Sequence, residues 1–385
     1  MQKNPDGEPL PEAALKDPRQ LYDHMRAICP AAHSDGVVTL FRHADVIAAA
    51  KDFATFSSAV SAHRQVPNSL DPPEHDVFRA IVDRFFTPER MRALEPKVRQ
   101  CARDIIAALP MHTVVDAVRQ LGYPFAVHVQ TRWLGWRGIE ETLLAWMAEN
   151  HAATRSGDPS RTAAVASAFD RITADQIERR RALGDAAACD PTTELMRTRV
   201  DGELLSDADI VSILRNWTAG DLGSIAAAIG VVAHFLATHR EVQQALREDS
   251  SHLTLAIDEM LRMDDPFISN RRVVTAATDI AGARLDPGAR VYLNWTSANR
   301  DEAVFGDPDA YQPAENAPHN LVYGIGPHIC PGRPLATLEL VAATQTLLQL
   351  TSSIELATEV EPERETWPVG GWRHVPVRLR AAIAR

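Results

Sequence analysis

Residues 323–339 read YGIGPHICPGRPLATLE, and this stretch decides the fold of the 385-residue chain. Gly324 and Gly332 stand on either side of a single cysteine, and glycine tolerates backbone angles that other residues avoid. The stretch therefore predicts a tight turn around one sulfur, that of Cys330. Pro331 suits the first position of a helix. We expect Cys330 at a helix N-terminus, where backbone N–H groups lower the pKa of a thiol.

The same stretch resembles the heme-binding loop of the cytochrome P450 family, whose pattern is F-G-x-G-x-[HR]-x-C-x-G-x-x-[LI]-A-x-x-E. Every fixed position matches except the first, where Tyr323 replaces phenylalanine. The resemblance implies a bacterial-type heme-thiolate monooxygenase in which Cys330 is the axial ligand to the iron of heme b. It also implies a mainly α fold with a smaller β region, with a long central helix over the heme and the cysteine loop beneath. A thiolate ligand favours cleavage of the O–O bond.

The composition fits a globular enzyme. Hydrophobic residues make up 45% and charged residues 24% of the chain, and the net charge of −11 argues against a nucleic-acid partner. The four cysteines form no CxxC pair, so neither a disulfide framework nor a zinc site is expected. The polar N-terminus is neither a signal peptide nor a membrane anchor, and no uncharged apolar stretch is long enough to span a membrane. We expect a cytoplasmic protein.

Helical periodicity dominates the chain, with a smaller number of short β signals. We expect amphipathic helices over residues 75–108, 139–154 and 161–183, and a long apolar helix over about 206–238 that crosses the centre of the molecule. The β signals fall at 36–41, 271–281, 289–294 and 374–381. Because no repeat or linker divides the chain, we expect one domain over residues 1–385, of which about 1–18 form a flexible N-terminal segment.

Glu259 and Arg262 are three residues apart, so they share a helix face and can pair. Their position about 70 residues before the cysteine resembles the structural ExxR motif of the family. In the family an arginine normally completes this network, but the corresponding residue here is Glu315, which would repel Glu259. Either Asn316 or His319 takes the place of that arginine, or Glu315 turns outward.

The resemblance also implies four cationic side chains for the heme propionates. His75 and Arg79 are one helical turn apart and can reach the same propionate. Arg272, preferred over its neighbour Arg271, matches the strand arginine of the family, and His328 matches the fourth position. Charge-assisted hydrogen bonds from these groups would offset the burial of two carboxylates. The other positions expected to contact the cofactor are Ala219, Tyr323, Gly324 and Gly332.

The long helix contains NWTAGDLGS over residues 216–224, which only partly resembles the family pattern [AG]-G-x-[DE]-[TS]. Ala219 and Gly220 match, and small residues there leave space for O2 and substrate. Leu222 stands where we expect the acid and Gly223 where we expect the alcohol. Neither side chain can donate a proton to bound oxygen, as general acid catalysis requires.

Three explanations are open. The acid passes to Asp221 and the alcohol to Ser224, although Asp221 points about 200° away from position 223 along a helix. Alternatively, Gly223 leaves room for a water or a substrate hydroxyl that carries the proton, which is the explanation we favour. The third is that the protein uses peroxide or catalyses another reaction. The candidate catalytic positions are therefore Gly220, Asp221, Gly223 and Ser224. The alternative for Asp221 is a hydrogen-bonded polar residue on the far face of the helix, without a catalytic role.

The sequence thus predicts a monooxygenase that inserts one oxygen atom from O2 into a small or medium organic substrate. Because 385 residues contain no flavin or ferredoxin module, NAD(P)H-derived electrons would come from a separate ferredoxin and ferredoxin reductase. The alternatives are a peroxide-using or non-oxygenating heme-thiolate enzyme, and a heme protein that binds ligand without turnover. A short loop over residues 59–70 predicts an open or mobile pocket. The candidate substrate contacts are Val60, Phe267 and Ile268, and the sequence does not name the substrate.

Overall fold

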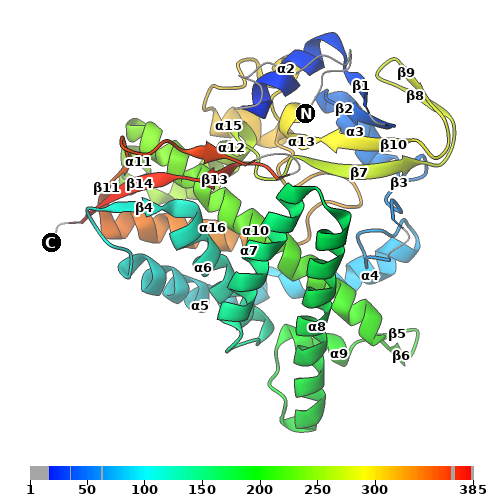
Figure 1. Ribbon diagram of the computed structural model, residues 1–385, viewed down its shortest axis with the longest axis horizontal. Helices are drawn as coiled ribbons and strands as arrows, with labels where there is room; N and C mark the ends of the chain where they lie inside the picture. The colour runs from blue at the N-terminus through cyan, green and yellow to red at the C-terminus, as the bar shows by residue number, and fades with distance from the viewer. Residues whose placement is uncertain (1–16, 35, 62–63, 366–368, 383–385) are drawn as a thin grey trace.

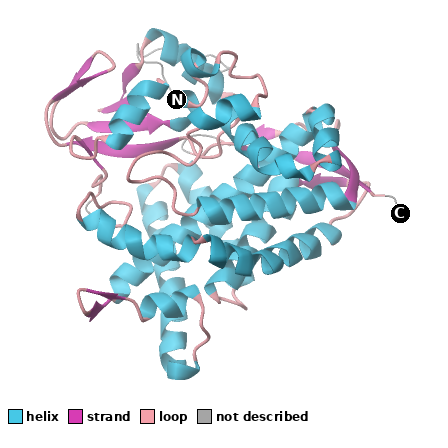
Figure 2. Ribbon diagram, turned by 180° about the vertical axis from the view of Figure 1, so that it is seen from behind, coloured by secondary structure: helices cyan, strands magenta, loops and turns pink. Residues whose placement is uncertain are grey.

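Helices form most of the computed structural model, which describes residues 17–34, 36–61, 64–365 and 369–382 (Figure 2). The α-helices are α2 (Pro18–Ile28), α3 (His43–Lys51), α4 (Glu74–Asp83), α5 (Pro88–Ala107), α6 (Tyr123–Leu134), α7 (Glu140–Ser156), α8 (Pro159–Leu183), α9 (Pro191–Met196), α10 (Asp207–Thr238), α11 (Arg240–Glu248), α12 (Leu253–Met263), α13 (Trp295–Ala298), α14 (Glu302–Phe305), α15 (Pro313–Asn316) and α16 (Arg333–Leu350). The short 3-10 and π-helical turns are η1 (Arg84–Phe86), η2 (Ala117–Gly122), η3 (Gly184–Ala186), η4 (Ser250–His252) and η5 (Ala317–His319).

The strands are short and fall into a five-stranded sheet and smaller ribbons. They are β1 (Ala31–Ser34), β2 (Val37–Leu40), β3 (Phe56–Ser57), β4 (Val114–Asp116), β5 (Arg199–Val200), β6 (Glu203–Leu204), β7 (Ser269–Val274), β8 (Thr278–Ile280), β9 (Ala283–Leu285), β10 (Arg290–Asn294), β11 (Thr351–Leu356), β12 (Glu363–Arg364), β13 (Trp372–His374) and β14 (Pro376–Ala381). The largest sheet has the order β1-β2-β10-β7-β3, and a three-stranded sheet has the order β11-β14-β4. The expected mainly α fold with a smaller β region is confirmed.

The helix α10 runs through the middle of the molecule, with other helices around it (Figure 1). It begins close to the expected boundary, because Ser206 caps it: the Ser206 hydroxyl accepts a hydrogen bond from the backbone N–H of Asp209 at 3.1 Å. The helix is long and apolar enough to cross a membrane, but 67% of its most apolar window is buried inside the protein. Its apolarity therefore serves the protein core.

The elements around α10 approach it closely at glycines. A Cβ atom at Gly122, at the end of η2, would lie 2.9 Å from the backbone of Ala226 on α10. Only glycine permits such an approach. On the other side α16 packs between α5 and α10, which places the cysteine loop at the base of the central helix.

The five-stranded sheet lies at the top of Figure 1, beside the helical part of the molecule, and has a hydrophobic cluster of its own. Strand β10 pairs in parallel with β2 and antiparallel with β7, where Val291 is opposite Arg272. Side chains alternate between the two faces of a strand. Arg272 is consequently buried, whereas its neighbour Arg271 is exposed.

Several expected element boundaries differ in the structure. The segment 75–108 forms two helices, because Thr87 has an extended backbone and caps α5, which begins at Pro88. The β signal over 271–281 is likewise divided between β7 and β8. At the N-terminus, residues 1–16 lie outside the described part of the chain, and α2 already begins at Pro18 behind the capping side chain of Asp17.

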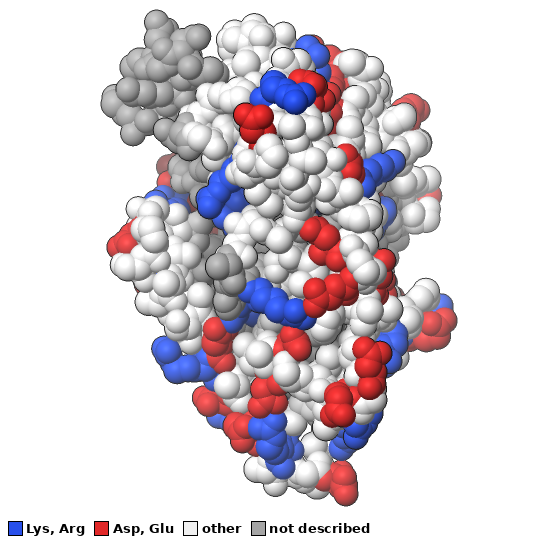
Figure 3. Space-filling view, turned by 90° about the vertical axis from the view of Figure 1, so that its right-hand side faces the viewer, with Lys and Arg blue, Asp and Glu red and all other residues white. Residues whose placement is uncertain are grey.

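Acidic and basic side chains are interspersed on the face shown in Figure 3. Many of the described charged residues are engaged in ion pairs, such as Arg90 with Glu194 and Arg181 with Asp207. The drawn part of this face therefore does not present a continuous basic surface of the kind that binds nucleic acid.

Candidate active site

The predicted turn around one cysteine is confirmed. The backbone N–H of Cys330 donates to the carbonyl of Tyr323 at 2.9 Å, which closes the loop. Gly324 has a φ of +71° and Gly326 a φ of +80°, and a Cβ at position 326 would lie 2.6 Å from the carbonyl oxygen of Ala50. The glycines are therefore required by backbone angle and by contact.

The helix after the loop starts later than expected. Pro331 does not begin it, because α16 starts at Arg333 with Gly332 as its N-cap. Burial raises the pKa of the Cys330 thiol, while hydrogen bonds from the backbone N–H groups of Gly332 and Arg333 lower it by a smaller amount. The backbone N–H groups thus lower the thiol pKa as expected, but desolvation of the thiolate outweighs them and the net shift is upward.

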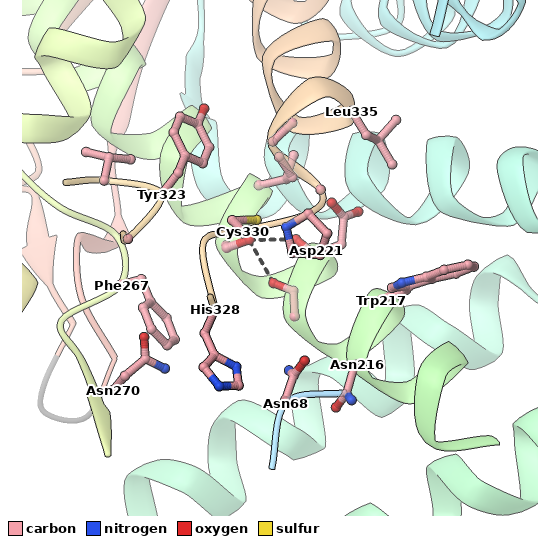
Figure 4. A pocket seen from close by; sticks show the side chains of 18 of the residues that line it. Asn68, Asn216, Trp217, Asp221, Phe267, Asn270, Tyr323, His328, Cys330 and Leu335 are labelled. Atoms are coloured by element: carbon pink, nitrogen blue, oxygen red, sulfur yellow. Dashed lines mark hydrogen bonds between the residues drawn. The ribbon is translucent and has the colours of Figure 1, made fainter. Parts of the chain in front are cut away.

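The Cys330 sulfur faces a cavity of about 330 Å³ (Figure 4). Its walls come from α4, α10, the start of β7, the cysteine loop and the first turns of α16. The sequence-predicted residues that line it are His75, Arg79, Gly220, Asp221, Ser224, Phe267, Arg272, Tyr323, Gly324, His328, Cys330 and Gly332. Segments more than 250 residues apart in sequence therefore meet around one sulfur.

Four cationic or titratable side chains gather at one side of this cavity. The rings of His75 and His328 lie with their centroids 4.5 Å apart. The guanidinium of Arg79 donates to the carbonyl oxygens of Pro327 and Ile329 at 3.0 and 2.7 Å, and so ties α4 to the cysteine loop. Burial lowers the pKa of His328 to about 3, and the positive charge of nearby Arg272 acts in the same direction. A positive potential at this wall favours an anionic ligand.

Arg272 lacks the compensation that buried guanidinium groups usually have. Its side chain is 5% exposed and donates to the carbonyl of Arg271 at 2.8 Å. Among the described residues no carboxylate forms an ion pair with it. Burial lowers its pKa to about 10, and the attraction of the more distant Asp71 offsets only part of that shift. A buried charge without a counterion is costly. The donor set, one thiol with two arginines and two histidines around a largely apolar cavity, therefore fits a cofactor that carries a metal and carboxylates.

The ExxR pair is present, and the question of its third member is answered. The Arg262 guanidinium donates to both Glu259 oxygens, at 2.8 and 2.9 Å, and both side chains are buried. The amide of Asn316 donates to Glu259 Oε1 at 2.7 Å. Glu315 is exposed, and His319 is exposed as well. Of the alternatives that the sequence left open, the structure thus favours Asn316 in place of the arginine, with Glu315 turned outward, over His319.

The central helix presents different residues to the cavity from those that the sequence pattern suggested. Leu222 is fully buried in the hydrophobic core, and neither it nor Gly223 lines the cavity. The Ser224 hydroxyl lies at the cavity and donates to the carbonyl of Gly220, one turn earlier, at 2.7 Å. Of the two candidate positions for the alcohol, Ser224 therefore lines the cavity, whereas Gly223 does not.

The space beside Gly223 is partly filled. A Cβ there would meet Nε2 of His151 at 3.4 Å, and the other ring nitrogen of His151 is 2.8 Å from the hydroxyl of Tyr123. Burial lowers the pKa of His151 to about 4. Position 223 therefore faces α7 and a neutral imidazole. By contrast, a Cβ at Gly220 would have no heavy atom within 4 Å, so Gly220 borders open cavity.

Three sequence-predicted contacts lie elsewhere. Ile268 is buried in a cluster with Tyr22 and Met25, Val60 is not part of the cavity wall, and Ala219 packs against the main core. Ile268 lies one residue before β7, and its side chain packs into that cluster and not toward the cavity, which the sequence pattern did not indicate. Lining residues that the sequence reasoning missed are Asn68, Trp133, Asn216, Trp217 and Asn270. Of these five, only Asn216 and Trp217 could have been identified from the sequence, because they lie one helical turn before Gly220.

Comparison with known proteins agrees with the fold and the site. The sequence profile of the family described as Cytochrome P450 matches residues 160–370. Steroid C26-monooxygenase of Mycobacterium tuberculosis is 30% identical, over 94% of this chain and 94% of its own length. Erythromycin C-12 hydroxylase of Saccharopolyspora erythraea is 28% identical, over 89% of each chain. The chain belongs to the cytochrome P450 family.

A solved structure leads to the same conclusion. A mutant of P450 EryK in complex with erythromycin B superposes with a TM-score of 0.88 at 28% identity, covering 96% of this chain and 99% of that one. A third relative is cyclomarin C epoxidase CymV of Salinispora arenicola, so the relatives comprise a hydroxylase, an epoxidase and a monooxygenase. The protein is a cytochrome P450 monooxygenase. Membership of this family implies a heme iron and O2-dependent oxidation of a small molecule.

Proposed function

We propose that the cavity binds heme b with Cys330 as the axial ligand to iron. The observation that carries this assignment is the buried, unpaired Arg272 on the wall of a cavity that ends on a thiol. Arg272, His328, His75 and Arg79 would surround the two propionates. Two carboxylates supply the counterions that Arg272 lacks within the protein. Tyr323 and Gly332 border the same cavity and complete the proximal wall.

When bound, the heme thiolate supplies the redox chemistry that activates O2 and favours O–O cleavage. The protein residues have other tasks. The closed cysteine loop fixes the sulfur, and Gly220 keeps the distal wall open for O2 and substrate. Ser224 presents a hydroxyl to the cavity, which can hold a water or a substrate oxygen in position. Phe267 and Trp217 provide apolar surface that keeps bulk water away from the reacting oxygen.

The proposed reaction inserts one atom of O2 into an organic molecule of small or medium size. The named relatives act on a macrolide and on steroids, and we propose a substrate of comparable, largely apolar character for this chain. The amide side chains of Asn68, Asn216 and Asn270 are the polar groups that would orient it. Electrons derived from NAD(P)H would reach the heme from a separate ferredoxin and ferredoxin reductase in the cytoplasm.

Peroxide is a second candidate for the oxidant, because Leu222 and Gly223 supply no acid to the cavity. The two functions differ in one assay. The holoprotein is incubated with testosterone and erythromycin B as probe substrates, either with NADPH and a surrogate ferredoxin pair or with hydrogen peroxide alone. Product in the first arm supports the monooxygenase route. Product only in the second arm supports the peroxide route, and Soret shifts without product in either arm support ligand binding without turnover.

Cofactor binding is tested by variants with matched controls. We expect the reduced, CO-bound protein to show a thiolate-type Soret band that Cys330→Ala abolishes and Cys189→Ala, at an exposed position, retains. We expect Arg272→Ala to lower heme affinity about tenfold or more, because a charge-assisted contact is worth about 1.5–3 kcal/mol. Arg271→Ala, on the exposed face of the same strand, should leave heme affinity unchanged. A thiolate band in the Cys330→Ala protein would contradict the assignment.

A further inference from the structure

The loop between β3 and α4 is bonded to the central helix at one residue. The backbone N–H of Val66 donates to Oγ of Ser212 at 2.7 Å, and its carbonyl oxygen accepts from Nδ2 of Asn216 at 2.9 Å. Val66 is 1% exposed, so bulk water does not reach it and these two backbone groups need partners in the protein. Ser212 and Asn216 are about one turn apart on α10. Two side chains of one helix therefore hold a buried loop residue, and we call this contact the Val66 clamp.

The loop is also closed by hydrogen bonds of its own. The Ser69 hydroxyl accepts from the backbone N–H of Gln65 at 2.7 Å and donates to the carbonyl oxygen of the same residue at 3.1 Å. The backbone N–H of Leu70 donates to the carbonyl oxygen of Pro67 at 3.0 Å. Residues 65–70 thus form a compact turn attached to α10, and this turn fixes the position of the side chain at its tip, Asn68.

Asn68 lines the cavity, and its amide forms no hydrogen bond with the residues that the structure describes. Asn216 lines the cavity as well and is bonded to the carbonyl of Val66, two residues before Asn68. Figure 4 shows both amides at one corner of the cavity, which we call the amide corner. Because Nδ2 of Asn216 is bonded to Val66, its Oδ1 is left as an acceptor. The corner therefore offers the N–H groups of Asn68 and the carbonyl oxygens of both side chains.

The amide corner is neutral. Pro67 and Trp217, which adjoin Asn68 and Asn216 in the chain, also line the cavity and are apolar. The third amide, Asn270, stands on β7 two residues before Arg272, and its Oδ1 accepts from Nε1 of Trp295 at 2.8 Å. It therefore lies with the groups assigned to the propionates. A charged ligand group at the amide corner would be buried without a counterion, which is costly, so the corner favours a neutral polar group.

A secondary amide or lactam matches the donors and acceptors of the amide corner. Its N–H can donate to a carbonyl oxygen of Asn216 or Asn68, and its carbonyl oxygen can accept from the Asn68 amide. A ketone, an ester or an N-alkylated amide has no N–H group, so it would leave the fixed Oδ1 of Asn216 without a donor after water is displaced. A site built to hydrogen-bond a ligand discriminates strongly against analogues that lack the bonding group.

We propose that the amide corner selects substrates that carry a secondary amide or a lactam. Asn68 is the specificity-determining residue, and Ser212 is a positioning residue because it acts through Val66. This inference deepens the proposed monooxygenase function and rests on it. Gly220 follows Asn216 by four residues and lies on the same face of α10, where it borders open cavity. A substrate bonded at the corner therefore extends along the open wall at Gly220.

Four ligands that share one bicyclic skeleton test the proposal. Hydrocarbostyril is a secondary lactam, N-methylhydrocarbostyril lacks its N–H group, β-tetralone has a methylene in place of that group, and tetralin has neither donor nor acceptor. Dissociation constants for the resting holoprotein are measured by equilibrium dialysis and by the Soret shift, so the test does not depend on turnover. Circular dichroism and the CO-bound Soret band establish that each variant is folded and loaded before it is compared.

We expect the parent protein to bind hydrocarbostyril about tenfold more tightly than β-tetralone and the N-methyl derivative, because each of these loses a buried hydrogen bond. Asn68→Leu should weaken hydrocarbostyril binding about tenfold without weakening tetralin binding. The matched control is Asn150→Leu on α7, outside the cavity wall, which should change neither. The proposal is overturned if the parent protein binds lactam and ketone equally. It is overturned as well if Asn68→Leu keeps the ratio of the two affinities, lactam to tetralin, within twofold of the parent.

The Val66 clamp is tested with Ser212→Ala and the conservative variant Ser212→Thr, which keeps a hydroxyl group. We expect Ser212→Ala to lower the ratio of lactam to tetralin affinity and Ser212→Thr to retain it. An equal loss of affinity for all four ligands in Ser212→Ala would show a merely structural role and refute the positioning role. Failure of the underlying monooxygenase function would appear as a missing thiolate band in the unmodified protein. A protein that has this band but binds none of the four ligands would contradict the amide corner alone.

Discussion

The network around Glu259 gives the sharpest test of the structural reasoning. Asn316→Ala removes an amide that donates to Glu259 Oε1 at 2.7 Å, in a site where Glu259 and Arg262 are 2% and 0% exposed. Water cannot easily replace that donor. A hydrogen bond to a charged group is worth about 1.5–3 kcal/mol, and the buried carboxylate would lose one of its partners. We therefore expect Asn316→Ala to reduce the free energy of unfolding by about 1.5–3 kcal/mol.

The expected shift in melting temperature follows from the size of the protein. An unfolding entropy of about 2.1 cal/mol/K per residue gives about 0.8 kcal/mol/K for 385 residues. The loss thus corresponds to a decrease in Tm of about 2–4 °C, which calorimetry of the heme-loaded protein can measure. Glu315→Ala, at the exposed neighbour on the same short helix, is the matched control and should change the free energy of unfolding by less than about 0.5 kcal/mol.

A second substitution at the same site makes the prediction more specific. Asn316→Asp is nearly isosteric but places a second carboxyl group against buried Glu259. We expect it to destabilise the protein more than Asn316→Ala at neutral pH, because like charges repel in a buried site. Part of the loss should be recovered as the pH falls and the new carboxyl group is protonated. The reasoning would be refuted if Asn316→Ala were as stable as Glu315→Ala, or if Asn316→Asp were as stable as the parent protein.

Two further predictions concern the cysteine loop and a buried histidine. Gly326→Ala combines a positive φ with a Cβ 2.6 Å from the carbonyl oxygen of Ala50. Heme content after expression and Tm should therefore both fall more than in Gly324→Ala, where the positive φ is accompanied by a contact of only 3.8 Å. Equal losses in the two variants would contradict the role of the close contact. Burial lowers the pKa of His151 from 6.5 to about 4, so the unfolded chain binds a proton between these pH values that the folded chain does not. Stability should be complete above about pH 6.5 and decrease by up to about 3 kcal/mol toward pH 4, and His151→Gln should flatten this dependence in denaturant titrations at several pH values.

Local sequence was sufficient where the structure depends on neighbours along the chain. The glycines around Cys330 predict its turn because backbone angles are a local property, and Glu259 and Arg262 pair because three residues separate them on a helix. The apolar run of α10 predicts a central helix for the same reason. The predicted helix boundaries were wrong where a capping residue sets the end of a helix. At Thr87 the backbone is extended, so one helical segment ends before this residue and α5 begins after it.

Other features of the site depend on segments that are distant in sequence. From sequence alone, Asp221 could be interpreted as a hydrogen-bonded polar residue on the far face of the helix. In the structure its Oδ2 has no hydrogen-bond donor among the described residues, and the residue lines the cavity. The direction of Ile268 depends on its cluster with Tyr22 and Met25 of α2, and its side chain does not line the cavity. The net pKa shift of the Cys330 thiol depends on burial by surrounding elements.

The sequence by itself determined the heme-thiolate family, the cysteine loop, the paired Glu259 and Arg262, and the long central helix, because each is encoded by residues within a few turns of one another. The tertiary structure decided that Asn316 completes the network, that Ser224 is the alcohol at the cavity, and that Asp221 lines the cavity. The physical reason is that hydrogen-bond partners and burial are set by the packing of distant segments, and these fix both the direction of a side chain and the state of its proton.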